Sequence, residues 1–249
     1  MNLDAETLDY LHGRRFSNGH VFDLGNKGAC LRRSERLLQL VQGLRVLHVG
    51  CCDHLPLIQE KRQQGLYLHE NLCRVATQCV GIDTNTEGVA LLRSTGFPDV
   101  YTPDNAPPFS IVNGEERAYD ICLLADVIEH IGNPVEFLAS MRRYQFKRLV
   151  VVTPNAFRWR NSLPGGEAIN TDHRFWFTPY TLCKVLVDAG FEPQRVELCH
   201  SDYATWRGVF AAKLLGLVPR WRDTLLVEAV NQIGYLEGLG HAFINEQKG

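Results

Sequence analysis

The fold class follows from the stretch YDICLLADVIEHIGNPVEFL (residues 119–138). Its first eight residues are a mostly apolar run that ends in Asp126, a pattern typical of a strand buried on both faces of a sheet. From Pro134 to Tyr144 apolar residues recur at intervals of three to four, which is the period of a helix. A buried strand that leads into a helix predicts one unit of a layered α/β fold.

The same design recurs on both sides of this stretch. Further strands are predicted at residues 45–50, 79–83, 100–104, 148–155, 193–199 and 223–230. Helical periods occur at residues 66–77, 87–95 and 178–189, and a further helix is expected near residues 203–217. Strands that alternate with helices indicate an α/β fold with a doubly wound, mostly parallel, seven-stranded sheet.

Three parts of the chain are expected from this pattern. Residues 1–42 precede the first strand and show helical spacing over residues 29–41, so they are predicted to form an N-terminal helical cap on the site. Residues 43–230 are expected to form the core domain. Residues 231–249 are expected to form a C-terminal tail.

Composition limits the class of protein. The 249 residues carry 26 basic and 28 acidic side chains and are 45% hydrophobic, so the chain can bury a full core and is not disordered. The near-neutral charge argues against a dedicated nucleic-acid binder. No apolar run approaches the roughly 20 residues that span a bilayer, and the N-terminus lacks the order of a signal peptide. We expect a soluble cytoplasmic protein.

The eight cysteines include no CxxC pair, and several lie in apolar runs. We therefore expect reduced, mostly buried thiols and no zinc site. The apolar segment 208–217 is interpreted as a helix that packs in the core or in a dimer, and not as a membrane-surface helix. A homo-oligomer therefore stays open.

Ligands of such sheets bind at the carboxyl ends of strands, where the direction of the connections reverses. Gly50 ends the first strand, where a missing side chain lets a ligand approach the backbone. Asp83 ends the second strand, where a carboxylate can accept both hydroxyls of a ribose. Asp104 ends the third and is placed to meet an adenine amino group. The alternative for each aspartate is a helix N-cap.

The chain resembles the class I S-adenosylmethionine-dependent methyltransferases from about Arg45 to Val230. The resemblance lies in VLHVGCCDH (46–54), VGID (80–83), YDICLLADVIEHIGNPVEFL (119–138), LVVVTPN (149–155) and DHRFWFTPYTLCKVLVDAGF (172–191). It implies a Rossmann-like methyltransferase fold, S-adenosylmethionine as cofactor, and the branch of small-molecule, quinone and glycan-pathway enzymes. The cofactor-binding residues that it implies are Gly50, Cys51, Cys52, Asp53, Asp83, Thr84, Asp104, Asn105 and Ala125.

The first loop departs from the family pattern. His48 replaces the usual acidic residue before the glycine, and Cys52 and His54 replace the second and third glycines. We expect Asp53 to take the place of the missing acid as the partner of the cofactor's ammonium group.

Asp126, Glu129 and His130 form a DxxEH motif, and His173 follows the fifth strand in a segment expected to fold back over the pocket. Positions i, i+3 and i+4 of a helix share one face, so the three side chains are predicted to converge. Two carboxylates and two imidazoles are a reasonable shell for Mg²⁺, Mn²⁺, Fe²⁺ or Zn²⁺. The motif resembles the ExxEH plus downstream histidine that holds a divalent metal in small-RNA 2′-O-methyltransferases and in ubiquinone-pathway O-methyltransferases.

Two alternatives stay open for this motif. Glu129 could cap the helix while His130 packs against the sheet. Without a metal, His130 or His173 could act as the general base that takes the proton of an acceptor hydroxyl, because imidazole titrates near neutral pH. The candidate catalytic residues are therefore Glu129, His130 and His173, and the candidate metal ligands are Asp126, Glu129, His130 and His173.

Arg158 and Arg160 follow the fifth strand and alternate with Phe157 and Trp159. This pattern could hold an anionic, ring-bearing substrate such as a nucleotide-linked sugar through charge and stacking. The alternative is a lid that packs its aromatic side chains inward. The predicted substrate-binding residues are Asn155, Arg158, Trp159 and Phe175.

These features predict a methyltransferase that acts on a hydroxyl of a small molecule or sugar, with metal assistance left open. The alternatives are an inactive methyltransferase-like protein that serves as a binding or assembly partner, and an RNA 2′-O-methyltransferase. A nicotinamide dehydrogenase is disfavoured because CCDHLP follows Gly50, where such an enzyme needs G-x-G-x-x-G.

Overall fold

The computed structural model describes residues 1–24, 31–162, 166, 167, 169–202, 210, 214 and 217–231, apart from the side chain of Val112. Three expected features lie wholly or partly outside these residues: the start of the helical pattern at residues 29–41, most of the helix expected near residues 203–217, and nearly all of the tail. Within the described residues, no helix is both long and apolar enough to cross a bilayer.

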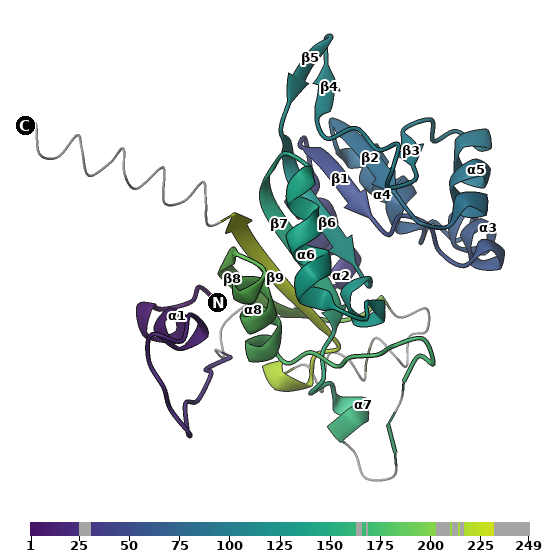
Figure 1. The fold of residues 1–249 in the computed structure, drawn as a ribbon. Coiled ribbons are helices and arrows are strands. Elements are labelled where there is room, and N and C mark those ends of the chain that lie inside the picture. Colours follow the sequence, from purple (N-terminus) through teal and green to yellow (C-terminus); the bar gives the residue numbers. More distant parts are fainter. Residues whose placement is uncertain are drawn as a thin grey trace, which may run out of the picture.

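A seven-stranded sheet forms the centre of the molecule (Figure 1). Its strands, in spatial order, are β3 (Val100–Tyr101), β2 (Gln78–Ile82), β1 (Arg45–Val49), β6 (Tyr119–Ala125), β7 (Phe146–Pro154), β9 (Thr224–Asn231) and β8 (Phe191–Cys199). The first five are parallel, whereas β9 runs antiparallel to both β7 and β8. The predicted doubly wound, mostly parallel sheet is confirmed.

Helices cover both faces of this sheet. They are α1 (Ala5–Leu11), α2 (Arg33–Val41), α3 (Leu55–Gln63), α4 (Leu68–Val75), α5 (Thr86–Ser94), α6 (Pro134–Ser140), α7 (Trp159–Ser162) and α8 (Pro179–Asp188). The 3₁₀ turns are η1 (Ile128–His130), η2 (Met141–Arg143) and η3 (Pro219–Trp221), and β4 (Ser110–Val112) pairs with β5 (Glu115–Arg117) in a separate hairpin. Side chains of α1, α6 and α8 join the core on one face, and those of α2 and α4 join the core on the other.

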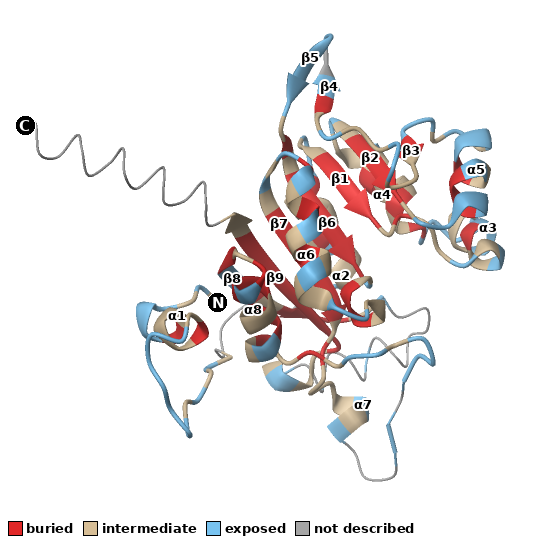
Figure 2. Ribbon diagram, viewed as in Figure 1, coloured by how far each residue is buried: buried red, intermediate tan, exposed pale blue. Residues whose placement is uncertain are grey.

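Alternate residues of each central strand enter different cores. In β1, Leu47 and Val49 belong to the core of α6 and α8, whereas Val46 belongs to the core of α2 and α4. The central strands are therefore buried on both faces, as their red colour in Figure 2 shows. Burial on both faces explains why each strand appears in the sequence as an almost continuous apolar run.

Some elements differ from the expected ones. The third strand ends at Tyr101, so Asp104 lies in the turn that follows it, and the helix that begins at Pro134 gives way to a 3₁₀ turn at Met141. Helices α1 and α3 and the β4–β5 hairpin were not predicted. In the hairpin, Asn113 (φ 53°) and Gly114 (φ 79°) form the Asn-Gly turn that favours two-residue connections.

The two helices of residues 1–42 lie on opposite faces of the sheet. Leu11 of α1 enters the core that contains α8, whereas Leu37 of α2 enters the core that contains α4. Of these two helices, α2 reaches the carboxyl ends of the strands, because Arg33 at its first turn forms an ion pair with Asp126.

Asp120, near the start of β6, links this strand to its two neighbours, β1 and β7, through side-chain hydrogen bonds. Its carboxylate accepts hydrogen bonds from the backbone N–H (3.0 Å) and the guanidinium (2.8 and 2.9 Å) of Arg45 on β1. It also accepts one from Lys147 Nζ (2.8 Å) on β7. These bonds, those of Arg45 above all, hold the pKa of Asp120 well below its ordinary value. The carboxylate therefore stabilises the register of β1, β6 and β7.

We predict that Asp120→Asn lowers the free energy of unfolding by about 2 kcal/mol at pH 7, because hydrogen bonds to a charged group are lost. Urea unfolding measures this change. The difference from wild type should shrink as the pH falls below the ordinary aspartate value of 3.8, since protonation removes the same charge. Glu115→Gln, which removes an exposed carboxylate paired with Arg117, should change stability by less than about 0.5 kcal/mol. Equal effects of the two variants would contradict this role.

Candidate active site

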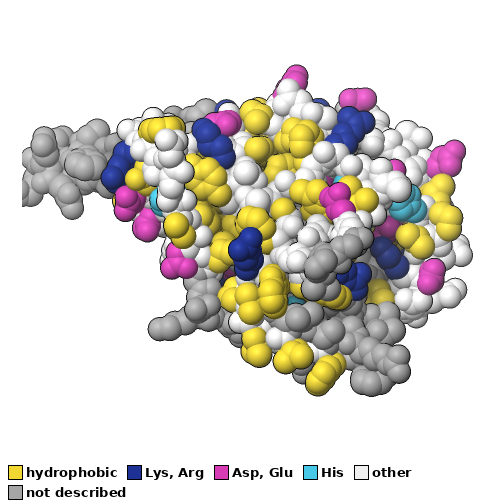
Figure 3. Space-filling model, turned by 90° about the horizontal axis from the view of Figure 1, so that it is seen from below, with side chains coloured by type: hydrophobic (Ala, Val, Ile, Leu, Met, Phe, Trp, Pro, Cys, Tyr) yellow, Lys and Arg dark blue, Asp and Glu magenta, His cyan; other side chains and the backbone are white. Residues whose placement is uncertain are grey.

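The direction of the chain connections reverses between β1 and β6, because β2 and β3 lie on one side of β1 and the later strands lie beyond β6. Ligands of doubly wound sheets bind at the carboxyl ends of strands beside such a reversal. Figure 3 shows the underside of the molecule, toward which these strands run in Figure 1. Histidine, acidic and basic side chains lie there among apolar ones.

Gly50 ends β1 in a left-handed conformation with φ +75°, which favours glycine. Its N–H donates to the carbonyl of Ile82 at the end of β2 (2.8 Å). A Cβ on Gly50 would lie 2.3 Å from Val127 Cγ2, so the loop after β1 packs directly on the turn after β6. Of the next two residues, Cys51 is buried and Cys52 is half-buried.

Asp83 joins the loops that follow β1 and β2. Its Oδ2 accepts from the backbone N–H of Cys52 (2.8 Å), and its Oδ1 accepts from that of Asn85 (2.9 Å). The N-cap of α5 is Asn85, whose side chain accepts from Gly88 N, so Asp83 is not the helix cap. A carboxylate has about four acceptor positions, so each oxygen of Asp83 keeps one for a ligand hydroxyl.

The remaining predicted cofactor residues surround this point. Asp104 and Asn105 are exposed in the turn after β3, where Asn105 donates to Thr102 through its backbone N–H (3.0 Å) and its side chain (2.9 Å). Thr84 is exposed beside Asp83, and Ala125 is buried at the end of β6. The strand ends thus bring these residues to one edge of the sheet.

Asp53, which was expected to replace the missing acid, and His48, which stands in its place, both have other partners. Asp53 forms an ion pair with Lys61 of α3, so a cofactor ammonium group would have to compete with that lysine. His48 is buried on the α4 side of the sheet, where its Nδ1 lies 3.2 Å from His69 Nδ1. Burial, and then the neighbouring His69, lower the pKa of His48 well below 6.5.

Asp126 does not share a helical face with Glu129 and His130. The motif forms a 3₁₀ turn over Ile128–His130, and α6 begins only at Pro134. Asp126 adopts φ +57° and binds Arg33 of α2, with Oδ2 2.7 Å from the guanidinium. The expected helix at this motif is therefore wrong, because the chain turns sharply between β6 and α6.

Glu129, His130 and His173 do lie together, and one ligand atom of each lies within 4.8 Å of the others. His173 Nε2 is 4.0 Å from Glu129 Oε1, and the rings of His130 and His173 meet edge to face with centroids 4.8 Å apart. Backbone N–H groups of Arg174 (2.8 Å) and Phe175 (3.3 Å) donate to the carbonyl of Glu129. The segment after β7 therefore folds back onto the DxxEH turn, as the sequence predicted.

The polar atoms of this cluster are incompletely paired. Glu129 Oε2 accepts from Thr153 Oγ1 (3.0 Å), whereas Glu129 Oε1 and His173 Nδ1 are buried without a hydrogen-bond partner among the described residues. Burial raises the pKa of Glu129 from 4.5 to about 8, and the Asp126 carboxylate adds to this effect. Burial, and then His130, lower the pKa of His173. Both shifts favour the neutral forms of Glu129 and His173.

The residues predicted to hold the substrate divide into two groups. Asn155 is fully buried, and its side-chain amide donates to the carbonyls of Arg220 (2.9 Å) and Arg222 (2.8 Å). It holds η3 against the end of β7. Arg158 instead lies over the Trp176 ring at 4.6 Å from its centroid, and Arg160 lies over Trp159 at 5.3 Å. Phe175 is 38% exposed.

Two contributors to the site were missed from the sequence: Thr153 binds Glu129, and Arg33 binds Asp126. Trp176, which follows Phe175, packs edge to face on His173 with centroids 5.9 Å apart. Thr153 could have been found, since it precedes Pro154 at the carboxyl end of a predicted strand. Arg33 gave no local signal, because its partner lies more than ninety residues away in the chain.

Comparison with known proteins finds several methyltransferases among solved structures. A solved S-adenosylmethionine-dependent methyltransferase from Aquifex aeolicus is 16% identical over 80% of this chain and 89% of its own, with a TM-score of 0.48. One from Mesorhizobium loti is 17% identical over 83% and 100%, with a TM-score of 0.48. Magnesium protoporphyrin IX methyltransferase from Synechocystis PCC 6803 is 13% identical over 91% and 93%, with a TM-score of 0.46. No curated protein matches the sequence significantly.

The sequence profile of a methyltransferase domain matches residues 22–196. This region runs from before α2 into β8 and contains every strand end described above. The chain therefore belongs to the methyltransferase domain family and is a methyltransferase.

Proposed function

We propose that this enzyme methylates a hydroxyl group of a small molecule or sugar. The observation that carries the proposal is the cluster of Glu129, His130 and His173, which supplies proton acceptors beside the strand ends. S-adenosylmethionine, when bound, supplies a methyl group on a positively charged sulfur that needs no further activation. The protein must then position the acceptor and remove its proton.

Asp83 is the proposed partner of the cofactor ribose. It is half-buried, and each of its oxygens keeps an acceptor position after binding the backbone of Cys52 and Asn85. The other proposed cofactor contacts are Gly50, Cys51, Cys52, Asp53, Thr84, Asp104, Asn105 and Ala125, which all lie at or next to the strand ends.

His130 is placed to accept the proton of the acceptor hydroxyl. Its Nδ1 lies 3.2 Å from the carbonyl of Asp172. The carbonyl can only accept, so a neutral His130 carries its proton on Nδ1 and its lone pair on Nε2. His173 is half-buried and packs edge to face on His130, and Glu129 faces His173. A positive charge that develops on an imidazole would favour the loss of the Glu129 proton, and the resulting carboxylate would stabilise that charge.

The same three residues fit a divalent cation. One carboxylate and two imidazoles suit Zn²⁺, Fe²⁺ or Mn²⁺. Within the part of the chain that the structure describes, Glu129 Oε1 and His173 Nδ1 are buried without hydrogen-bond partners, as expected of a site for a ligand. A cation held there would lower the pKa of an acceptor hydroxyl. We leave Asp126 out of this set because Arg33 already binds its carboxylate.

The proposed acceptor is anionic and carries a ring. Arg158 and Trp159 lie on the segment that follows β7, and Phe175 exposes an apolar ring beside His173 in the chain. Guanidinium groups and aromatic rings bind such molecules by charge and stacking. Asn155 is omitted from this site because its amide holds η3.

We expect Asp83→Ala to weaken S-adenosylmethionine binding at least about tenfold, because two hydrogen bonds from ribose hydroxyls to a carboxylate are lost, each contributing roughly 1 kcal/mol or more. Isothermal titration calorimetry measures the affinity. Glu87→Gln removes the same charge from an exposed position four residues away and should bind like wild type. Since Asp83 also joins two loops, a melting curve must show that the variant is folded. Unchanged affinity in folded Asp83→Ala would overturn the cofactor assignment.

His130→Ala and His173→Ala should each lower kcat by about 100-fold, since general-base catalysis contributes roughly 10²–10⁴-fold, while cofactor affinity stays unchanged. Release of S-adenosylhomocysteine is measured with sugars, nucleotide-linked sugars, phenols and total RNA as acceptors. His12→Ala, at the end of α1, is the control and should keep full activity.

The same assay tests for a metal and for the class of acceptor. Loss of activity when a chelator is added would show that methyl transfer depends on a bound metal ion. Methyl transfer to RNA alone would replace a small molecule by RNA as the acceptor.

Stability should fall with rising pH through the titration of Glu129. Its folded-state pKa of about 8 lies above the ordinary 4.5, so between these values the folded protein holds a proton that the unfolded chain releases. Glu129→Gln keeps the shape and cannot ionise. We expect the melting temperature of wild type, relative to this variant, to decrease from pH 5 to pH 8. A constant difference between the two across that range would contradict the buried, protonated carboxyl.

A further inference from the structure

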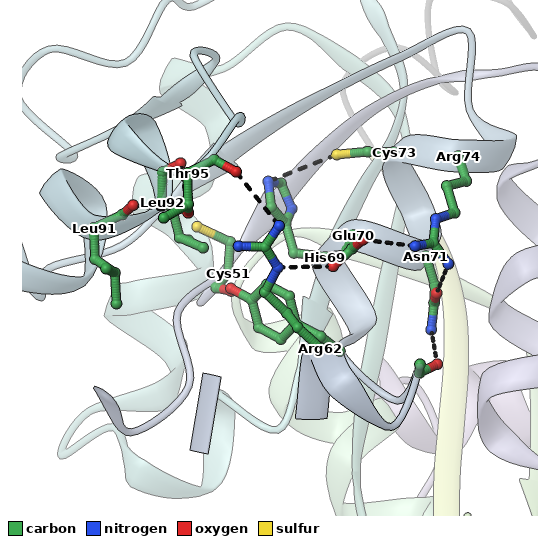
Figure 4. A network of polar contacts seen from close by, with 12 residues as sticks. Cys51, Arg62, His69, Glu70, Asn71, Cys73, Arg74, Leu91, Leu92 and Thr95 are labelled. Atoms are coloured by element: carbon green, nitrogen blue, oxygen red, sulfur yellow. Dashed lines mark hydrogen bonds and ion pairs between the residues drawn. The ribbon is translucent and has the colours of Figure 1, made fainter. Parts of the chain in front are cut away.

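A second cluster of metal-binding side chains lies away from the acceptor site, between β2 and α4. His69 and Cys73 are four residues apart on α4 and so share one face of the helix, and Cys79 lies on β2. One ligand atom from each of the three lies within 4.8 Å of the others. Figure 4 shows the sulfur of Cys73 pointing toward the His69 ring.

The distances within this cluster resemble those of a bound metal shell. Cys73 Sγ lies 3.7 Å from His69 Nε2, and Cys79 Sγ lies 3.8 Å from His69 Nδ1. In a tetrahedral site with bonds of about 2.3 Å to sulfur and about 2.0 Å to nitrogen, the two ligand atoms are roughly 3.6 Å apart. The two sulfurs lie nearest to different nitrogens of the ring, so a single ion at Nε2 would require the Cys79 side chain to turn toward Cys73. One ligand atom of each residue already lies within 4.8 Å of the others.

His48 orients the imidazole of His69. His48 Nδ1 lies 3.2 Å from His69 Nδ1, and the two rings stack with centroids 5.4 Å apart. A hydrogen bond at Nδ1 leaves Nε2 of His69 as the nitrogen that can bind a metal, and Nε2 is the atom nearest Cys73. Metal-binding histidines commonly have their second nitrogen fixed by such a neighbour.

The surrounding chain makes room for this imidazole and leaves one side accessible. A Cβ on Gly81 of β2 would lie 2.9 Å from His69 Cε1 and 2.8 Å from Cys51 Sγ, so only glycine admits both side chains. His69 and Cys79 are buried, whereas Cys73 is half-buried and gives an ion a route inward. The cluster thus consists of two thiols and an imidazole, buried at His69 and Cys79 and partly exposed at Cys73.

We propose that His69, Cys73 and Cys79 bind one thiophilic metal ion, with Zn²⁺ as the ion expected. Two thiolates and an imidazole select Zn²⁺ or Cu⁺ over Mg²⁺, Mn²⁺ and Ca²⁺, which prefer oxygen ligands. The site joins α4 to β2 next to the loop after β1, because Tyr67, just before α4, donates to the carbonyl of Cys51 (2.7 Å). We assign it a structural role that braces this loop, in place of the expectation of no zinc site that the lack of a CxxC pair had suggested. It is separate from the Glu129 cluster, which lies in η1 and in the segment between α7 and α8.

The test uses the reduced full-length protein. Zn²⁺ is titrated in competition with a chromogenic chelator, and Co²⁺ is titrated while thiolate-to-cobalt absorption is recorded. In the His173→Ala background, which disrupts the acceptor cluster, we expect one Zn²⁺ per chain and a thiolate-to-cobalt band. The affinity should be reduced at least about tenfold when Cys73→Ser or Cys79→Ser is added. In wild type, Zn²⁺ should also slow the alkylation of Cys73, a measurement that needs no variant to fold.

Two control variants separate this site from its neighbours. Cys52→Ser disrupts the nearby trio of Cys51, Cys52 and Asp83, and His173→Ala disrupts the acceptor cluster, so both should still bind Zn²⁺ with the thiolate-to-cobalt band intact. Absence of the band, loss of Zn²⁺ binding in Cys52→Ser but not in Cys73→Ser, or Cys73 alkylation that Zn²⁺ does not slow would each overturn the proposal. The outcome is independent of the methyl acceptor.

Discussion

Gly50 has no room for a side chain, and this allows the loop after β1, which carries proposed cofactor contacts, to pack on the turn after β6, which leads to Glu129. Its φ is +75°, and a Cβ would come within 2.3 Å of Val127. The loop after β1 and the turn after β6 therefore touch at van der Waals distance, next to the point where the connections of the sheet reverse. The proposed cofactor contacts and the Glu129 cluster lie at one edge of the sheet, and no side chain separates these two segments at Gly50.

The buried polar atoms of the Glu129 cluster destabilise the fold, and the hydrophobic core offsets this effect. A buried carboxyl oxygen without a partner destabilises a fold by about 1–3 kcal/mol, and Glu129 Oε1 is such an atom among the described residues. Thr153 and the backbone of Arg174 hold Glu129 in place from two different elements. Polar groups held in an incompletely satisfied state are typical of sites that bind a ligand or move a proton.

Alternating side chains of strand β1 pack on opposite faces of the sheet. His48 points toward α4 and meets His69, whereas Leu47 and Val49 support the core under α6 and α8. The histidine that stands where the family has an acid therefore belongs to the α4 side of the sheet and not to the cofactor loop. Its neighbours His69, Cys73 and Cys79 place soft ligands directly behind that loop.

The sequence by itself determined the sheet and its functional edge, because burial on both faces makes each strand a local apolar run and each strand end a change in composition. Gly50, Asp83 and the DxxEH motif were found in this way. Only the tertiary structure decided that Asp126 pairs with Arg33, that Asn155 holds η3, and that Cys73 and Cys79 meet His69. Periodicity reports local backbone conformation, whereas the partner of a polar atom is set by packing between elements distant in the chain.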